Sequence, residues 1–229
     1  MIDENPILQL RRTFDRPDAD LLRQLQDVPT GFVVDCLQGR GALDYRVKPL
    51  LPVSETLVGT AVTCACGPVD NLGVLGALDI AQPGDIIVAS TDACIQAAVV
   101  GDLVLEMMKN KQLAGLITDG LVRDIEGIER VGLPVYCKGV TPNSPNRNGP
   151  ATAGLPINLD TVHVCPGDVI VADRDGVVVV PRDRLPGVCQ QLETVKKAEA
   201  ELLAAVESGL TRPAFYAELV ASGKVEELD

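Results

Sequence analysis

The sequence predicts one α/β domain with helical extensions at both ends. Apolar runs alternate with helical patterns between residues 86 and 137, which is typical of parallel strands joined by right-handed crossovers. Two similar segments, PGDIIVAS at 83–90 and PGDVIVAD at 166–173, each place a tight turn before a buried strand. The 229 residues leave room for one large domain or two small ones, and we see no linker that would divide residues 1–229.

Residues 1–40 are predicted to form N-terminal helices. In RPDADLLRQLQDV the leucines and the valine recur at helical spacing, and Pro17 suits a first helical turn. In TGFVVDCLQG we expect a second short helix, with Thr30 as its N-cap and Gly39 at its end.

The middle of the chain is predicted to form the sheet. VGTAVTCACG, from about Val58, alternates small and β-branched residues and predicts a strand. Further strands are expected at 86–89, 115–118 and 134–137, with a helix ending near Lys111 and a short one over 124–131. The Gly-, Pro- and Asn-rich segment 139–154 predicts a loop, and RDGVVVVP continues the second PGD segment through a hairpin turn into another strand.

The tail from 183 to 229 is predicted to be a charged helical extension. Lys, Glu and Gln cover one face, and the other carries a stripe formed by Leu192, Val195, Ala198, Leu202 and Val206.

Composition excludes several classes of function. Twenty basic and 32 acidic residues give a net charge of −12, so we expect neither a nucleic-acid partner nor an anionic membrane. Aromatic residues make up 3% and tryptophan is absent, which disfavours base stacking. The acidic start MIDENPIL is unlike a secretory leader, and no apolar run is long enough to span a bilayer. With an odd number of cysteines, seven, these features predict a cytoplasmic protein with reduced thiols.

Polar side chains follow the strand predicted at 115–118. DGLVRDIEG places Asp119, Arg123 and Asp124 in one short loop, which Gly120 allows to turn sharply. Ligands of parallel α/β sheets bind beyond the carboxyl ends of strands, so this loop is a candidate site. An N-cap aspartate beside a surface ion pair would leave the same pattern.

A second candidate segment follows strand 86–89. If a helix begins near Gly101, the backbone amides of residues 101–104 point outward and can bind a carboxylate, and Asp102 faces the same space. A helix that runs through from about residue 94, with Gly101 inside it, fits the periodicity equally well.

Asp102, Arg123 and Asp124 together fit a metal-assisted reaction of a keto acid. Carboxylates suit Mg²⁺ or Mn²⁺, which keep several waters and need only one or two such ligands. The Arg123 guanidinium offers a fixed positive fork for an oxyanion or carboxylate. A chelating cation and this arginine would both stabilise charge on the keto oxygen.

These residues resemble a known family. Asp102, twenty further residues and then Arg123-Asp124 is similar to the Asp-x20-Arg-Asp pattern of class II pyruvate aldolases in the RraA-like superfamily, named for regulator of ribonuclease activity A. Those aldolases act on 4-hydroxy-4-methyl-2-oxoglutarate and 4-carboxy-4-hydroxy-2-oxoadipate. The resemblance covers most of the chain through GTAVT, PGDIIVA, GDLVLEMM, ITDGLVRD, PVYCKG and PGDVIVADRDGVVVVP.

The resemblance implies an α/β/β sandwich of the swivelling-domain type that assembles as a homotrimer or homohexamer. It also implies that Asp124 ligates Mg²⁺ or Mn²⁺ directly, that Asp102 holds a metal-bound water, and that Arg123 contacts the substrate keto oxygen. Glu199 from a neighbouring subunit would reach the metal through water. The pyruvyl carboxylate would be held by the backbone amides of Gly101, Asp102, Leu103 and Val104.

The implied reaction is retro-aldol cleavage of a 4-hydroxy-2-oxo acid. A water, bound to the metal or held by Asp102, would take the proton of the C4 hydroxyl. The C3–C4 bond would break, and pyruvate would leave as a stabilised enolate. Oxaloacetate decarboxylation passes through the same enolate and is expected as a side activity. Lys138 and Arg147 could contact the distal carboxylate, or be solvated loop charges.

The main alternative is a non-catalytic, RraA-like regulator of a ribonuclease. The long charged tail and the Asp102, Arg123 and Asp124 set favour the enzyme, since the regulators are shorter. A zinc site is a weaker alternative. Cys64-Ala-Cys66 and His163-Val-Cys165 each place two soft ligands on one strand face, but not at the spacing of a zinc finger.

Two further classes of enzyme are disfavoured. Gly39-Arg40-Gly41 and Gly73-x-x-Gly76 are fragments of glycine-rich loops, and neither completes a dinucleotide-binding motif. The sequence has no G-x-S-x-G motif of a nucleophilic hydrolase.

Overall fold

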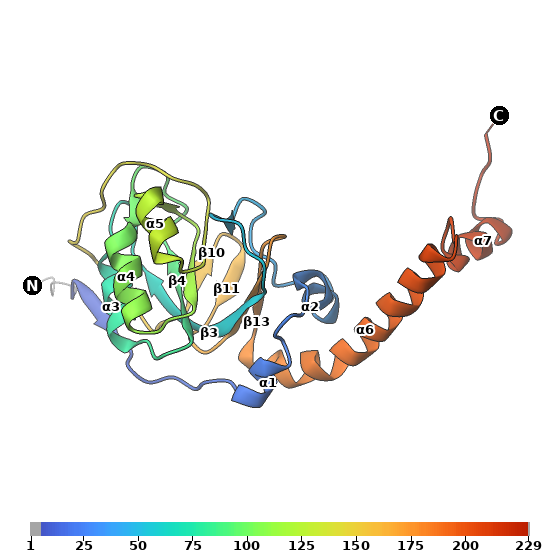
Figure 1. The fold of residues 1–229 in the computed structure, drawn as a ribbon, viewed down its shortest axis with the longest axis horizontal. Helices are drawn as coiled ribbons and strands as arrows, with labels where there is room; N and C mark the ends of the chain where they lie inside the picture. Colours follow the sequence, from blue (N-terminus) through green and yellow to red (C-terminus); the bar gives the residue numbers. More distant parts are fainter. Residues whose placement is uncertain (1–5, 229) are drawn as a thin grey trace, which may run out of the picture.

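The computed structural model describes residues 6–228 and has a mixed α/β fold built on one large sheet (Figure 1). Along the sheet the strands follow the order β1 (Leu8–Leu10), β9 (Ala151–Ala153), β3 (Leu57–Ala65), β4 (Asp85–Ser90), β6 (Gly115–Thr118), β8 (Val135–Cys137) and β2 (Lys48–Pro49). Strands β3, β4, β6 and β8 run parallel to one another. The predicted crossover pattern is thereby confirmed.

A hairpin branches from this sheet at β3. Strand β12 (Val169–Ala172) pairs antiparallel with both β3 and β13 (Val177–Val180). Two small ladders complete the β structure: the parallel pair β5 (Ala98–Val100) and β7 (Leu121–Val122), and the antiparallel pair β10 (Ile157–Leu159) and β11 (Val162–Val164).

Side chains that alternate along the strands divide the molecule into layers. On β4, Ile87 and Ala89 join the core that contains buried residues of α3 (Leu72–Ile80), α4 (Asp102–Asn110) and α5 (Ile125–Val131). Ile86 and Val88 face the opposite way and pack with residues of β10 to β13. These layers form the expected α/β/β sandwich.

A further helical layer covers the outer face of the β12–β13 hairpin. Val169 and Val171 of β12 pack there with residues of α2 (Thr30–Cys36) and α6 (Leu185–Glu207), and with Leu25, which follows α1 (Ala19–Arg23). Figure 1 shows α1, α2 and the start of α6 on the side of the molecule opposite α4 and α5.

The two PGD segments form equivalent turns before their strands. Asp85 accepts a hydrogen bond from the amide of Gln82 at 2.7 Å, and Asp168 accepts one from Cys165 at 2.8 Å, in both cases from the residue three positions earlier. Both aspartates are buried. The first strand nevertheless pairs parallel with β3 and the second antiparallel, so the local motif fixes the turn but not the direction of the strand.

The N-terminal segment differs from the prediction in three respects. A short strand, β1, precedes the helices. Helix α1 covers only Ala19–Arg23, because Asp18 caps it through the amide of Asp20, and Pro17 lies before it. Thr30 is the first residue of α2 rather than its N-cap, which is Pro29.

The C-terminal helix leaves the body of the molecule (Figure 1). Its buried residues Leu185, Val188, Cys189 and Leu192 all lie in the first third of α6. The later part of the predicted stripe is exposed, including Leu202 and Val206. A separate helix, α7 (Ala214–Ala221), has no buried residue.

No helix within residues 6–228 has the length and apolar character needed to cross a bilayer. The prediction about a leader concerns residues 1–8, of which 1–5 lie outside the described residues.

Candidate active site

Strands β5 and β7 bring the two candidate segments together. They pair in parallel, and the amide of Arg123 donates to the carbonyl of Val100 at 3.1 Å. Gly101 follows β5 and Arg123 follows β7, so both lie at the same end of this ladder. A Cβ on Gly101 would lie 3.2 Å from Cγ of Arg123 and would overlap Oδ2 of Asp124. The glycine therefore allows the side chains of Arg123 and Asp124 to approach the start of α4, which any larger residue would prevent.

A helix begins at Asp102, with Gly101 as its N-cap. Residues 98–100 are a strand, so the alternative of a helix running through from residue 94 is wrong. The amide of Leu103 donates to Oδ1 of Asp102 at 2.8 Å. The first turn of α4 thus begins at the residues that the sequence analysis selected as candidates for binding a carboxylate.

The Arg123 guanidinium is held between two neighbours. Its Nη1 donates to Oγ of Ser144 at 2.6 Å, and its Nε lies 3.2 Å from Oδ2 of Asp124. That Nε is buried and, among the described residues, makes no hydrogen bond, since the ion pair lacks hydrogen-bond geometry. About a third of the arginine side chain is exposed, so the pair is worth at most about 1 kcal/mol. Part of its donor capacity is free for a ligand.

Asp124 adopts a left-handed backbone conformation (φ 63°, ψ 52°) immediately before α5. This conformation costs an L-residue other than glycine about 1–2 kcal/mol, although aspartate and asparagine tolerate it best. Its side chain makes no capping hydrogen bond to α5 and is 44% exposed. Asp124 is thus the N-cap residue of α5 and pairs with Arg123, as the alternative predicts, but its carboxylate caps none of the helix amides.

Asp102 lies against the start of α5. A Cβ on Gly127 would approach the Cβ of Asp102 to 2.5 Å, and Nη2 of Arg130 is 3.6 Å from Oδ2 of Asp102. The Asp102 side chain is 24% exposed. Asp102 and Asp124 line one open pocket of about 640 Å³, together with Leu103, Ile125, Glu126, Gly127 and Arg130.

The donor set of this pocket fits a hard divalent cation. Two carboxylates, Asp102 and Asp124, face a solvent-accessible space beside an arginine, and Mg²⁺ needs only one or two carboxylates with waters. No group of three or more His, Cys, Asp or Glu residues within 6–228 is arranged to hold a metal, so the chain on its own offers no closed cage. Glu199 is on α6 and does not line this pocket.

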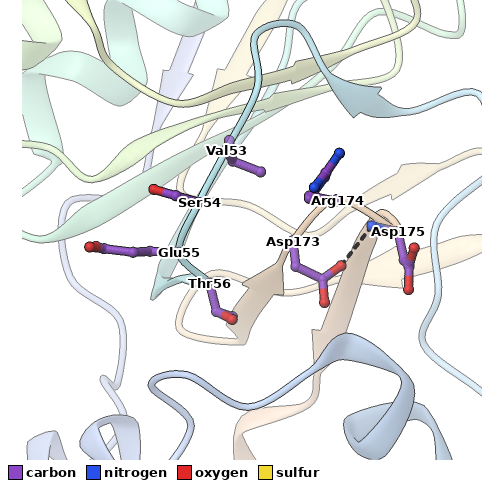
Figure 2. Close-up of a pocket in the computed structure, with 7 residues that line it drawn as sticks. All are labelled: Val53, Ser54, Glu55, Thr56, Asp173, Arg174 and Asp175. Atoms are coloured by element: carbon purple, nitrogen blue, oxygen red, sulfur yellow. Dashed lines mark hydrogen bonds between the residues drawn. The ribbon is translucent and has the colours of Figure 1, made fainter.

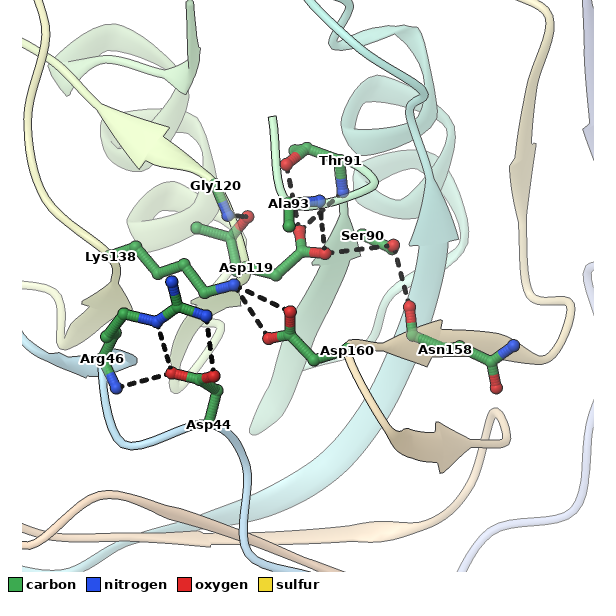
Figure 3. Close-up of polar contacts among 11 residues, drawn as sticks. Asp44, Arg46, Ser90, Thr91, Ala93, Asp119, Gly120, Lys138, Asn158 and Asp160 are labelled. Carbon is green, nitrogen blue, oxygen red and sulfur yellow. Dashed lines mark hydrogen bonds and ion pairs between the residues drawn. The ribbon is translucent and has the colours of Figure 1, made fainter. Parts of the chain in front are cut away.

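The structure separates Asp119 from Arg123 and Asp124. Asp119 is 1% exposed and accepts hydrogen bonds from the Thr91 amide at 2.7 Å, the Thr91 hydroxyl at 3.0 Å and the Ala93 amide at 2.9 Å (Figure 3). A Cβ on Gly120 would lie 2.7 Å from Oγ1 of Thr91. Asp119 therefore fixes the loop after β4. Gly120 lies in the expected bend, and its missing side chain also permits close packing against Thr91.

The candidates for a distal carboxylate are not in this pocket. The Lys138 side chain is 6% exposed and forms an ion pair with Asp160 at 2.8 Å (Figure 3). The carboxylate of Asp160 therefore already neutralises the lysine charge. Arg147 is exposed and does not line the pocket. His163 is exposed on β11, with Nδ1 3.0 Å from Oδ1 of Asn158 and Nε2 3.5 Å from Sγ of Cys165.

A pocket of comparable size, about 610 Å³, lies beside the β12–β13 turn and is lined by Glu55, Asp173 and Asp175, among others (Figure 2). Asp173 accepts hydrogen bonds from both the amide and the hydroxyl of Thr30, each at 2.8 Å, and from the amide of Asp175 at 2.8 Å. This carboxylate anchors α2 to the hairpin, and the Thr30 hydroxyl donates to it instead of capping the helix.

Three residues of the candidate site were missed by the sequence analysis. Ser144 lies in a loop that carries no recognisable signal for a contact with Arg123. Arg130 lies near the C-terminal end of α5. It is three residues after Gly127, so both residues lie on the helix face that contacts Asp102. Gly127, a glycine inside a short helix, was the one available signal of a close approach.

Comparison with known proteins agrees with this picture. The family model "RraA-like: Aldolase/RraA" matches residues 24–179. A protein of Halalkalibacterium halodurans with the name "Putative 4-hydroxy-4-methyl-2-oxoglutarate aldolase" is 35% identical over 184 residues, which cover 80% of this chain and 86% of that protein. Protein DlpA of Legionella pneumophila is 29% identical over 84% of this chain but only 32% of its own length.

Solved structures show the same fold. RraAS2 of Streptomyces coelicolor, described as an unusual member of the RNase ES inhibitor RraA protein family, has a TM-score of 0.74 at 26% identity, with 82% of this chain and 99% of that chain covered. A protein of Pseudomonas syringae has a TM-score of 0.75 at 24% identity, with 86% and 97% covered. The chain belongs to the Aldolase/RraA family, as its sequence motifs indicated.

Proposed function

We propose that this protein is a divalent-metal-dependent lyase that cleaves a 4-hydroxy-2-oxo acid to pyruvate and a second keto acid. One observation carries the proposal: the start of α4, Arg123 and Asp124 meet at one edge of a pocket that Asp102 also lines. The name of the relative at 35% identity supports an aldolase reaction. We take 4-hydroxy-4-methyl-2-oxoglutarate and 4-carboxy-4-hydroxy-2-oxoadipate as the first substrates to test.

Asp124 would hold Mg²⁺ or Mn²⁺ directly, and Asp102 would hold one of its waters. A bound divalent cation supplies positive charge that orients the α-keto acid and stabilises the enolate. The substrate carboxylate binds at the start of α4, among the backbone amides from Gly101 to Val104, because the N-terminus of a helix attracts an anion. The Leu103 amide donates to Asp102 in the structure and would exchange that partner for the substrate.

Arg123 stabilises charge on the keto oxygen as the C3–C4 bond breaks, and its contact with Ser144 fixes the position of the guanidinium. The carboxylate of Asp102 holds the water that receives the proton of the C4 hydroxyl. The electron pair of the broken bond forms the pyruvate enolate, which is then protonated at C3. Oxaloacetate loses CO₂ to give the same enolate, so we propose decarboxylation as a side activity.

We propose that the active form is a homotrimer or homohexamer in which Glu199 of a neighbouring subunit completes the site. Support comes from α6, which leaves the body and exposes Leu202, Leu203 and Val206, and from the exposed aromatic residues Phe215 and Tyr216 on α7. Isolated apolar residues on a surface are normal, but a series of them along a projecting helix is typical of an interface. We further propose a cytoplasmic location for one aldolase domain formed by residues 1–229.

The test is pyruvate release from a panel of 4-hydroxy-2-oxo acids and from oxaloacetate, with added Mg²⁺ and again with EDTA. Asp124→Asn is the variant of choice, since asparagine tolerates the left-handed backbone of this position and removes only the charge. We expect a loss of activity of at least about 100-fold. Glu129→Gln, an exposed change on the same helix, is the matched control. Activity that survives both EDTA and Asp124→Asn contradicts the proposal.

A second candidate function is non-catalytic regulation of a ribonuclease, which the structural similarity to RraAS2 favours. A pull-down and an RNA-cleavage assay with RNase ES, the enzyme named for the RraA relatives, test it. Inhibition of that enzyme by both wild type and Asp124→Asn, with no turnover of any keto acid, would replace the aldolase proposal.

A further inference from the structure

A groove of about 600 Å³ lies far from Arg123 in the fold, beside the start of α6. The turn that contains Gly39-Arg40-Gly41 forms one wall, and β11 and the segment before α6 form the others. Its accessible apolar surface comes from Ala42, Val162 and Pro181, and its polar groups come from Thr161, Arg40, His163 and Arg184.

The Gly39-Arg40-Gly41 motif is fixed in place by the backbone. Gln38, Gly39 and Gly41 all have positive φ angles, and the amide of Val179 donates to the carbonyl of Gly41 at 2.8 Å. A Cβ on Gly41 would lie 2.5 Å from the carbonyl oxygen of Val179. The glycine lets the turn lie directly on β13, and the turn then holds Arg40 at the rim of the groove.

The charge of the groove is opposite to that of the protein. Within the described part of the chain, its lining includes Arg40, Arg184 and His163 but no acidic residue. Carboxylates line the pocket of Figure 2, through Glu55, Asp173 and Asp175, and the candidate active site. A site without acidic side chains is unexpected in a chain with a net charge of −12.

Neither arginine of the groove has an internal partner. Among residues 6–228, Arg40 and Arg184 form no ion pair, and their guanidinium groups make no hydrogen bond. By contrast, the neighbouring Arg182 pairs with Asp15 at 2.8 Å. Two unpaired guanidinium groups beside an apolar surface can bind one carboxylate or phosphate, since arginine recognises both groups through paired N–H donors.

We propose that this groove binds a small organic anion, in which a carboxylate or phosphate is attached to an apolar body. The anionic group lies between Arg40 and Arg184, and the apolar body covers Ala42, Val162 and Pro181. The apolar surface distinguishes such a ligand from inorganic phosphate, which has nothing to place there. This inference does not depend on the proposed aldolase activity, because the groove shares no residue with that site.

The test is isothermal titration calorimetry of the full-length protein with phenyl phosphate and with benzoate. Every protein carries Arg123→Ala, so that the candidate active site contributes no anion binding. We expect saturable binding of at least one of the two probes at one site per chain, and the tighter probe identifies the anionic group. Arg40→Gln and Arg184→Gln should each weaken that binding by about tenfold or more, as the loss of a charge-assisted hydrogen bond predicts.

Arg174→Gln is the matched control, because this exposed arginine lines the acidic pocket of Figure 2 and not the groove. This variant should bind the probes as tightly as the Arg123→Ala protein from which it is made. Inorganic phosphate and benzyl alcohol should each bind at least about tenfold more weakly than the better anionic probe. The inference is overturned if neither probe binds, if the Arg40 and Arg184 variants bind like the control, or if either simpler probe binds equally well. Circular dichroism and urea unfolding check that each variant is folded.

Discussion

Gly101→Ala tests the assembly of the candidate active site most directly. The backbone of Gly101 is extended (φ −125°, ψ −172°), so alanine adopts it without strain. The added methyl group would overlap Oδ2 of Asp124 and lie 3.2 Å and 3.3 Å from Cγ and Nε of Arg123. The substitution therefore displaces these two side chains while leaving the strands and helices unchanged.

The effect on stability and the effect on activity should differ in size. Alanine is a poorer N-cap than glycine by about 0.5–1 kcal/mol, and the displaced side chains can move because they are 36% and 44% exposed. We expect the free energy of unfolding to fall by about 1 kcal/mol. A catalytic group displaced by about 1 Å costs about 100-fold in rate, which corresponds to about 2.7 kcal/mol of transition-state stabilisation.

Pyruvate release with Mg²⁺ gives the activity, and urea unfolding gives the stability. Gly187→Ala is the matched control, since a Cβ there meets no atom within 4 Å and the position lies in the first turn of α6; it should keep full activity and be at least as stable as wild type. Activity of Gly101→Ala within threefold of wild type would refute the reasoning. So would a loss of stability large enough to explain the loss of activity.

Three further predictions concern other parts of the fold. Asp119→Asn places an amide group against the donors of Thr91 and Ala93; we expect a loss of about 2–4 kcal/mol in urea unfolding, and a loss below 1 kcal/mol would contradict the anchoring role. Burial raises the pKa of the Cys137 thiol from its ordinary 9.0 to about 11, so the unfolded chain releases this proton first. The free energy of unfolding should therefore fall as pH rises from 9 to about 11, and less so in Cys137→Ala; equal slopes would show that this thiol contributes nothing. Truncation before Glu193 keeps all four buried residues of α6 but removes Glu199. The shortened chain should therefore fold, lose its activity and no longer form the oligomer, as measured by light scattering. A fully active monomer would contradict the intersubunit site.

The parallel core of the fold could be predicted from the sequence, because its signals are local. GLIT was predicted as a strand at 115–118, and β6 covers the same residues. The RDGVVVVP hairpin was also confirmed, as β12 and β13. A buried strand bounded by turn residues needs no information from distant parts of the chain. The short strand β1 carries no such signal, because it exists through its pairing with β9, more than a hundred residues away.

The candidate site shows the same division. Asp102, Arg123 and Asp124 were selected by residue type, by position after strands and by resemblance, and the structure places all three at one pocket or its edge. Asp119 was grouped with them because it is near in sequence, but its side chain faces the loop after β4. Neighbours in sequence point in different directions at a strand end, so proximity along the chain does not establish a shared site.

Composition, periodicity and motifs were sufficient to place this chain among acidic α/β proteins of the Aldolase/RraA family with a carboxylate and arginine motif. Periodicity, turn residues and motif spacing are properties of the chain and can be read before it folds. The folded molecule was needed to see that a helix begins at Asp102, that Lys138 is paired with Asp160, and that Arg40 and Arg184 share a groove. Each of these depends on contacts between segments far apart in the sequence, and such contacts exist only after the sheet has formed.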